Sequence, residues 1–397
     1  MTAPPSVAQA TLAPRQPSQA YLACAAGLAP LGLNAAVGLQ PVFEGLGASD
    51  PAGRAAAVAL YALGMGLGQP LAGDACDRWG RRPSMVMGLL LASVGALLAA
   101  WAANETALLL GRFITGLGLS TCLVVPRASL RDIRQGVALQ HSMALLSLVF
   151  AVVPAVTPPL AWALAQLHSW RTPLLAFALV LMLSALLAGR SYHETRPAST
   201  CVPHRRAWLG LARHRGVQRA TLAFAGIAAP FFILAAVGPA GIAASTGAGA
   251  GTVAALLGGT YLAFGLGNLW VRRHAATAGE THLSTGAAIA AFGALLLAAT
   301  LVWPTLWLWG LALSVYALGH GMVFPAAFAV VLRDMPQRAG LVTAAMGTVH
   351  MCSGALSAWI AGSLPGPPQR TAVAMACGMV ALGCLAWMFI PSHKDSS

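Results

Sequence analysis

Long apolar runs recur along the chain, separated by short polar intervals. Each run is about 20 residues long, which is the length that an α-helix needs to cross a hydrocarbon core of about 30 Å. The runs are continuous and rich in Leu, Ala and Gly, whereas strands of a membrane barrel would appear as short alternating segments. The pattern predicts an all-α membrane protein with twelve transmembrane helices, at 21–43, 55–76, 84–103, 107–127, 139–163, 172–190, 219–243, 253–272, 283–302, 306–332, 340–362 and 371–391.

Composition supports this prediction. Of the 397 residues, 58% are hydrophobic and only 8% are charged, whereas an ordinary soluble protein carries roughly 25% charged residues. A net charge of +13 could indicate nucleic-acid binding, but the cations lie between apolar runs and not on one polar face, so no nucleic-acid partner is expected. The seven cysteines have no metal-like spacing, and those inside apolar runs are expected to act as small hydrophobic side chains.

The distribution of Lys and Arg tests the number of spans. With both termini in the cytoplasm, 19 of the 23 cations fall on the cytoplasmic side, three fall outside and one, Arg112, lies within a span. This asymmetry is the positive-inside bias of membrane proteins, and one miscounted helix would reverse every later loop. We therefore expect a multi-pass protein with both termini cytoplasmic.

The longest polar interval, around 190–219, divides the predicted helices into two sets of six. A pair of six-helix bundles favours substrate binding between the halves, near the middle of the bilayer. The linker histidines have no compact metal-ligand spacing, so no metal is expected there. The predicted organisation is a cytoplasmic leader at 1–20, an N-terminal six-helix bundle at 21–190, a cytoplasmic linker at 191–218, a C-terminal six-helix bundle at 219–391 and a cytoplasmic tail at 392–397.

The loop between the second and third predicted spans is rich in charge and reads Gly73-Asp74-Ala75-Cys76-Asp77-Arg78-Trp79-Gly80-Arg81-Arg82-Pro83. Asp77 is placed to pair with nearby arginines and with the positive N-terminus of a neighbouring helix, and Gly73 and Gly80 allow close packing and a tight turn. A simpler interpretation is a positive loop that only sets orientation. The order of Asp, Arg, Gly and two further cations resembles the hallmark loop of the major facilitator superfamily. We predict a conformational latch made of Gly73, Asp77, Arg78, Gly80, Arg81 and Arg82.

Further segments in both halves resemble the Bcr/CflA group of drug exporters, which includes chloramphenicol and bicyclomycin exporters. These segments are Leu110-Gly111-Arg112-Phe113, Arg127-Ala128-Ser129-Leu130-Arg131-Asp132, Ser191-Tyr192-His193-Glu194-Thr195-Arg196-Pro197, Phe324-Pro325 and Ala339-Gly340. The resemblance implies the major facilitator fold, the bacterial inner membrane, drug:H⁺ antiport, function as a monomer, and the proton gradient as energy source with no cofactor.

Arg112 is the cation inside a span. A charge in this position costs several kcal/mol and is tolerated only when it faces a cavity or a partner. The alternative is an arginine that extends to the nearby membrane surface. The resemblance implies a role for Arg112 in proton coupling.

The sequence departs from the group at two places. Exporters of this type commonly carry an acidic residue in the first span, where this chain has Asn34, and Ala161 and Trp162 stand where glycines are usual in the fifth span. None of the ten acidic residues falls clearly in mid-membrane. Because an imidazole exchanges protons near neutral pH, we propose that His320 or His350 replaces the missing carboxylate. The alternative is a pair of neutral histidines hydrogen-bonded between helices.

The substrate cavity is expected among polar and aromatic residues of the inner spans, since amphipathic ligands bind in large apolar pockets with few polar anchors. Each of these residues could instead serve only in packing. The cavity candidates are Asn34, Gln40, Gln69, Trp162, Phe231, Tyr261, Tyr316 and Trp359.

The leading functional prediction is secondary efflux of a drug or siderophore-like metabolite by alternating access. Uptake by proton symport or facilitated diffusion is the second possibility, and a non-transporting membrane sensor is the third. The chain has no GxxxxGK[ST] segment for ATP, and no HExxH or GxSxG motif, so an enzyme is not expected.

Overall fold

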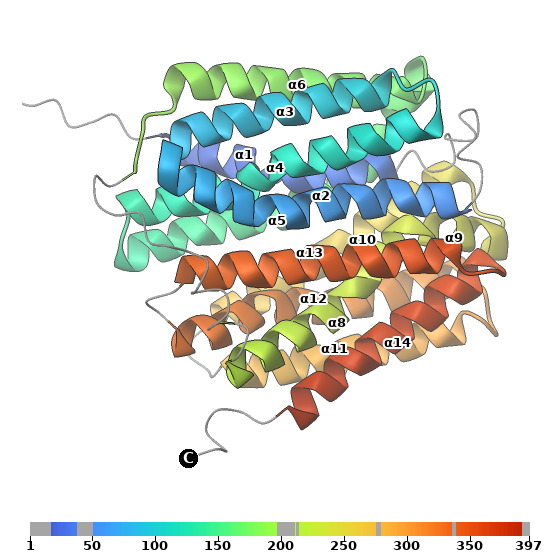
Figure 1. The fold of residues 1–397 in the computed structure, drawn as a ribbon. Helices are drawn as coiled ribbons and strands as arrows, with labels where there is room; N and C mark the ends of the chain where they lie inside the picture. The colour runs from blue at the N-terminus through green and yellow to red at the C-terminus, as the bar shows by residue number, and fades with distance from the viewer. Residues whose placement is uncertain are drawn as a thin grey trace, which may run out of the picture.

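A computed structural model of the protein describes residues 17–37, 51–196, 211, 214–274, 279–335 and 339–390. Within these ranges all regular secondary structure is α-helical. The helices lie side by side along the long axis of the molecule (Figure 1). The predicted all-α class is therefore confirmed.

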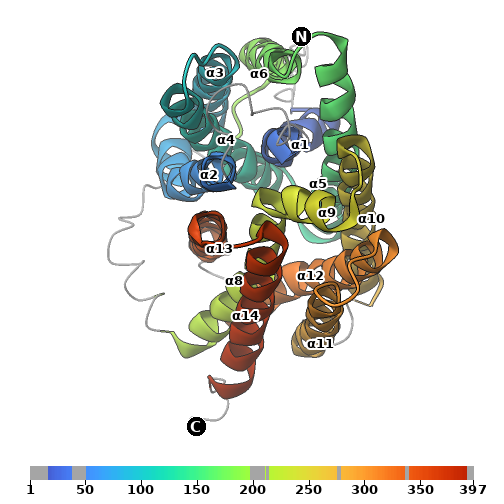
Figure 2. The same ribbon diagram turned by 90° about the vertical axis from the view of Figure 1, so that its right-hand side faces the viewer.

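The first six described helices form one half of the molecule. Viewed along their axes, they group together in the upper part of Figure 2. α3 packs against α4 and α6, and α4 also packs against α2. The helices of this half are α1 (Gln19–Val37), α2 (Pro51–Trp79), α3 (Arg81–Ala100), α4 (Glu105–Ile133), α5 (Gly136–Leu167) and α6 (Arg171–Ser191).

The remaining helices form the second half, in the lower part of Figure 2. α11 packs against α12 and α14, and α8 packs against α13 and α14. The helices are α8 (Arg215–Ala236), α9 (Gly238–Thr246), α10 (Ala250–Arg273), α11 (Gly279–Ala299), α12 (Leu306–Asp334), α13 (Ala339–Ser363) and α14 (Pro368–Phe389).

The seventh predicted span, 219–243, differs in the structure. It is divided between α8 and the nine-residue α9, with Val237 at the junction. Pro239 follows at the start of α9, where its missing N–H and fixed φ suit a first turn but do not continue a helix. The prediction of a single helix over this range was wrong because Gly238 and Pro239 end α8 early.

Eleven helices of the described ranges are long and apolar enough to cross a membrane. The long helix outside this set is α1, which packs against α4 and α5 within the first half. Exposed leucines cover the outward faces, for example Leu183 on α6 and Leu295 on α11, as a lipid-facing surface requires. The chain is a multi-pass membrane protein.

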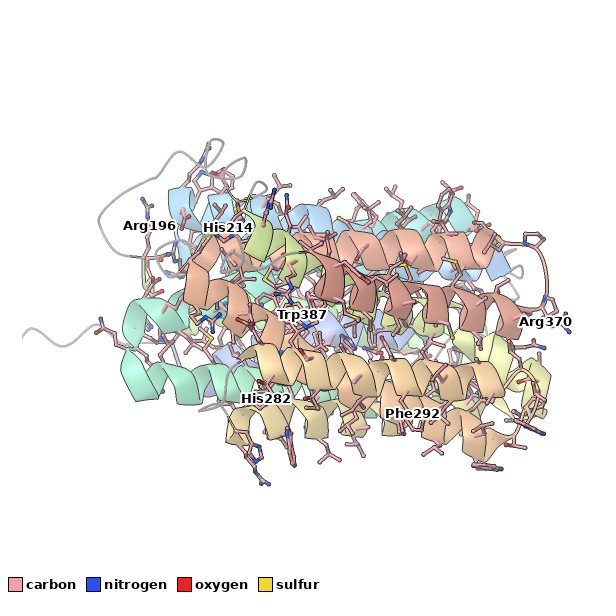
Figure 3. All side chains as sticks on the ribbon, turned by 90° about the horizontal axis from the view of Figure 1, so that it is seen from below. Arg196, His214, His282, Phe292, Arg370 and Trp387 are labelled. Atoms are coloured by element: carbon pink, nitrogen blue, oxygen red, sulfur yellow. The ribbon has the colours of Figure 1, made fainter. Side chains whose placement is uncertain are left out.

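Charged residues gather at the two ends of the helices. Arg196 and His214 lie at one end and Arg370 at the other (Figure 3). The first of these is also the end at which α2, α4, α6, α10 and α12 finish, each with an arginine in its last turn. We call it the arginine-rich end.

The two halves meet where α2 packs against α13 and α5 packs against α10 (Figure 2). Small residues permit this close approach. A Cβ at Gly258 of α10 would overlap the carbonyl of Ala155 on α5, and a Cβ at Gly347 of α13 would overlap the amide of Gln69 on α2. Packing of small residues, and not ionic pairing, therefore dominates the described contact between the halves.

Candidate functional site

Arg81 forms the centre of a charge cluster at the arginine-rich end. Its Nε donates to Asp132 Oδ2 at the end of α4 over 2.9 Å, and its Nη1 donates to Asp77 Oδ1 over 3.0 Å. Nη1 also donates to the carbonyl of Cys76 over 2.8 Å. Arg78 pairs separately with Asp74, one turn earlier, at 2.8 Å. The structure thus gathers the charged residues of the predicted latch and adds Asp132 to them.

Glu194, beyond the end of α6, accepts hydrogen bonds at the start of α3. Its carboxylate receives the backbone N–H groups of Arg81 at 2.8 Å and Arg82 at 3.1 Å, and those of Thr195 and Arg196 in its own segment. The carboxylate therefore caps α3, whose own N-cap residue, Gly80, supplies no side chain. Burial acts to raise the pKa of the Glu194 carboxyl, but the backbone hydrogen bonds outweigh it and lower this pKa below its usual value.

The two glycines of the predicted latch differ. Gly80 has φ +105°, and a Cβ at this position would overlap the carboxylate of Glu194. Gly73 lies within α2, where a Cβ would meet no described atom within 4 Å. The structure therefore explains the tight turn at Gly80, whereas the close packing expected of Gly73 is not present.

Arg112 lies in the core of the first half and is only 1% exposed. Its Nη1 donates to the carbonyl of Gly32 on α1 over 2.9 Å, and its Nε donates to the carbonyl of Ala57 on α2 over 3.3 Å. The guanidinium lies 4.3 Å from the centroid of the Tyr61 ring. The Tyr61 hydroxyl donates a hydrogen bond to Ala29 O over 2.6 Å. Arg112 therefore points into the bundle and does not extend to the membrane surface.

The partners of Arg112 are all neutral. Two carbonyl groups and an aromatic face solvate the guanidinium, and its Nη2 has no hydrogen-bond partner among the described residues. The described carboxylates lie at helix ends, as the sequence predicted. A full buried charge without a counter-charge is costly, which marks Arg112 as a candidate functional residue.

Asn34 joins the two halves. Its Oδ1 accepts a hydrogen bond from the Tyr261 hydroxyl of α10, and its Nδ2 donates to Pro30 O over 2.8 Å. Asn34 is fully buried. The amide that stands in place of the expected carboxylate is thus fixed between α1 and α10 by bonds at both of its polar atoms.

A small cavity of about 40 Å³ lies beside Tyr261, within the second half. This volume is enough for a water molecule or a small group. The cavity lies between α8, α10 and α12, and its lining includes the predicted residues Phe231, Tyr261, Tyr316 and His320. The remaining lining is Leu234, Ala235, Leu257, Thr260, Phe264, Leu313 and Ala317.

The hydroxyl groups of this cavity are already committed as donors. Tyr316 donates to Ile227 O at 2.8 Å and Thr260 donates to Leu257 O at 2.7 Å, while Tyr261 donates to Asn34. Their oxygens remain available as acceptors. The cavity therefore offers aromatic surface, hydroxyl oxygens and one imidazole.

His320 and His350 lie close together, with 6.5 Å between their ring centroids. His350 packs against Phe224 and Phe232, and His320 packs against Phe264. Both rings are buried, and the Nε2 atom of each has no hydrogen-bond partner among the described residues. The alternative expectation, a histidine whose hydrogen bonds are satisfied between helices, does not describe these two Nε2 atoms.

Other cavity candidates lie elsewhere. Trp359 is 54% exposed on α13 and is not among the residues that line the cavity beside Tyr261. Trp162 packs against Gly251 between α5 and α10, and Gln69 is buried over Gly347 with an unpartnered Nε2. Gln40 lies outside the described residues.

The sequence prediction of the site omitted Glu194 and Asp132 as functional residues. Both fall in segments that were noted only for their likeness to known exporters, after α6 and at the end of α4. The sequence signal for each is a carboxylate beside an arginine-rich helix end. The bonding partner, however, is Arg81, which lies 113 residues from Glu194 and 51 residues from Asp132 in the sequence. Within the described part of the chain, no group of His, Cys, Asp or Glu side chains is arranged to hold a metal ion.

The sequence matches the family model of the Major Facilitator Superfamily over residues 22–358. It is 26% identical over 360 residues to the multidrug resistance protein MdtL of Klebsiella pneumoniae (strain 342), covering 87% of this chain and 88% of MdtL. It is also 26% identical over 344 residues to YdgK of Bacillus subtilis (strain 168), an MFS-type transporter, covering 84% and 85% of the two chains.

Solved transporters share the fold. The human organic anion transporter MFSD10 superposes with a TM-score of 0.70 at 17% identity, over 95% of this chain and all of that one. A D-xylose–proton symporter superposes with a TM-score of 0.73 at 14% identity, over 94% and 98% of the two chains. At these identities the similarity establishes the fold alone and does not identify the transported compound.

The conformation of Gly80 gives a test of the turn. Gly80→Ala is expected to destabilise the protein by about 1–3 kcal/mol, because φ +105° is a region that side chains rarely adopt. Gly73→Ala is the matched control and should be neutral or stabilising by up to about 1 kcal/mol, since alanine is favoured inside a helix. Thermal unfolding of both purified variants in one detergent measures this. Equal melting temperatures would contradict the assignment.

The hydrogen bonds of Glu194 give a test with pH. Glu194→Ala should lower stability at pH 7 by about 1 kcal/mol, the usual cost of losing a helix cap. The folded pKa of Glu194 is lowered, so its contribution is present above the unfolded value of about 4.3 and is lost as the pH falls through the folded pKa. Glu194→Gln, which keeps an acceptor oxygen, should lose less. A stability difference unchanged between pH 7 and pH 3 would argue against this role.

Proposed function

Because the chain belongs to the major facilitator superfamily, we propose that it exports a small amphipathic compound, a drug or a siderophore-like metabolite, in exchange for protons. The chain is a membrane transporter and not an enzyme. Export is supported by the likeness to MdtL, a multidrug resistance protein, over most of both chains. We place the protein in the bacterial inner membrane with the arginine-rich end in the cytoplasm, following the positive-inside bias.

The single observation that carries this proposal is the aromatic cavity with its unpartnered histidine. Tyr261, Tyr316 and His320 line it, and the buried Nε2 of His320 lacks a partner among the described residues. A buried polar atom left unpaired costs about 1–3 kcal/mol unless a ligand, a water or a proton satisfies it. We assign this cavity to one end of the substrate, with the rest of the substrate lying between the halves once they separate.

The cavity lies entirely in the second half, whereas the Asn34–Tyr261 hydrogen bond crosses to the first. A substrate group that accepts from or replaces the Tyr261 hydroxyl would release Asn34. Substrate binding is thereby coupled to the separation of α1 from α10. Asn34 and Tyr261 are then proposed to alternate between bonding each other across the halves and bonding the substrate, and the unpartnered Nε2 of Gln69 is proposed as a further group for the substrate.

For proton coupling we assign His320 and His350 as the exchanging groups. Two imidazolium charges 6.5 Å apart would repel by about 2.5 kcal/mol at an effective dielectric constant of about 20. The pair is therefore proposed to carry one proton per cycle. Arg112, held by neutral carbonyls, is proposed to take part in proton coupling from the first half.

The charge cluster around Arg81 is proposed to act as the conformational latch. It joins α2, α3, α4 and the segment after α6 into one rigid end, against which α13 packs through α2. Gly80, Asp77, Arg78, Arg81 and Arg82 would then move as one body.

Proton-coupled uptake is the alternative function, and an accumulation measurement decides between the two directions.

Direction of transport is measured by accumulation. Overproduction in an efflux-deficient bacterial host should lower the intracellular level of radiolabelled chloramphenicol, or of another compound found in a susceptibility screen, and a protonophore should abolish the difference. The control is the same host producing the Tyr261→Phe and Tyr316→Phe double variant, which keeps the ring surface and loses both hydroxyls. Higher accumulation with the wild-type protein would overturn export in favour of uptake. Unchanged accumulation across the screen would favour the non-transporting sensor.

The role of the histidines is measured by proton release. The His320→Gln and His350→Gln double variant should lose the proton release that substrate addition causes in purified protein, while binding of the substrate persists. His282→Gln is the matched control, because His282 is also a buried histidine of the second half but bonds to His274 O at 3.0 Å, away from the cavity. Undiminished release in the double variant would refute the assignment.

A further inference from the structure

We propose that a groove between the start of α1 and the end of α6 binds the phosphate headgroup of an anionic phospholipid. The groove has a volume of about 540 Å³, enough for a glycerophosphate group, and lies at the arginine-rich end. It is lined by Pro17, Ser18, Tyr21, Leu187, Arg190, Ser191 and His193. These residues play no part in the proposed transport site, so the inference does not depend on the substrate or the direction of transport.

The polar lining of the groove is made of hydrogen-bond donors. Arg190 is exposed and forms no ion pair or hydrogen bond with the described residues. Ser18 Oγ accepts from the Tyr21 N–H at 3.1 Å, which leaves its own hydrogen free to donate. None of the described lining residues is acidic. A guanidinium with adjacent hydroxyls and an imidazole is a set of groups that binds a phosphate.

The groove continues a lipid-facing surface. On α6, Leu179, Leu183, Leu186 and Leu187 are exposed, and Arg190 follows them at the spacing of three or four residues that keeps side chains on one helix face. An acyl chain lying along these leucines would bring its phosphate to Arg190. Leu187 belongs both to this stripe and to the groove lining. This continuity of apolar stripe and cationic groove identifies the occupant as a lipid and not a soluble phosphate.

An anionic headgroup matches the charge of this end better than a zwitterionic one. The groove carries Arg190 with no carboxylate among its described lining residues, and the arginine-rich end is strongly cationic. Each arginine near a membrane surface contributes about 1 kcal/mol to attraction for anionic lipid. Phosphatidylglycerol is therefore expected to bind better than phosphatidylcholine.

Occupancy of the groove would brace the first half of the molecule. At its floor the Tyr21 hydroxyl donates to Ser184 O of α6 at 3.1 Å, and the Tyr21 ring meets Tyr192 edge to face at 5.9 Å. Tyr192 in turn bonds to Ser129 of α4. A lipid bound in the groove would hold α1 against α6. Tyr21 and Tyr192 already connect these two helices to each other and to α4, beside the charge cluster.

The test is lipid binding to the purified full-length protein by native mass spectrometry in detergent. Dioleoyl phosphatidylglycerol should bind more tightly than dioleoyl phosphatidylcholine, and Arg190→Gln should weaken the tightest phosphatidylglycerol site about fivefold. Arg273→Gln is the control, since it removes the same charge from an exposed residue at the end of α10, outside the groove, and should leave that site unchanged. Ser191→Asp, at an exposed position, should reject the lipid while retaining Arg190.

Three results would overturn the proposal. One is equal phosphatidylglycerol affinity for the wild-type protein, Arg190→Gln and Ser191→Asp. The second is an equal loss in Arg190→Gln and Arg273→Gln, which would indicate general attraction to charge. The third is displacement of the lipid by millimolar inorganic phosphate, which would identify the occupant as the soluble ion. If Arg190→Gln cannot be purified, Ser191→Asp against Arg273→Gln decides the question.

Discussion

The hydrocarbon environment constrains every polar group in this protein, because no water is available there to satisfy it. Most charges accordingly lie at the helix ends. There the Arg81 side chain pairs with Asp132, and the Glu194 carboxylate accepts a hydrogen bond from the backbone at the start of α3. Inside the bundle several polar groups are held by specific bonds. Arg112 is solvated by two carbonyl groups and one aromatic ring, and Asn34 is bonded at both of its polar atoms. Other buried polar atoms have no partner among the described residues, and these include Arg112 Nη2, Gln69 Nε2 and the Nε2 atoms of the two histidines.

The same constraint explains how two tightly packed halves can still separate. Their contact is built from small residues on α2, α5, α10 and α13, so no described salt bridge has to be broken in the membrane when the halves move. The described side-chain hydrogen bond between them, from Tyr261 to Asn34, is one that a substrate hydroxyl or amide can replace. Each half is meanwhile stiffened internally, the first by its charge cluster and the second by the aromatic rings around His320 and His350.

Sequence patterns predicted the helices well because each apolar run is long enough to need the membrane, and within the described residues Gly238–Pro239 divides one of the predicted spans. They also singled out Arg112, because a charge within a span is costly unless it faces a cavity or a partner. The pairings were beyond sequence reasoning. Nothing local indicates that Glu194 caps a helix 113 residues earlier, or that Asn34 meets Tyr261 across 227 residues. Trp359, which is 54% exposed, shows a further limit, because an aromatic side chain on an inner span has the same sequence signature whether it packs, lines a cavity or faces lipid.

Spin-label distances across both ends of the molecule test most directly whether the two halves alternate about their contact. In a cysteine-free background, one label pair would join His168 to Arg370 at the end opposite the arginines, and another would join Gln135 to Arg273 at the arginine-rich end. Acidification together with chloramphenicol, or the compound found by screening, should lengthen one distance and shorten the other. Distances that stay fixed, or that lengthen together, would contradict the account.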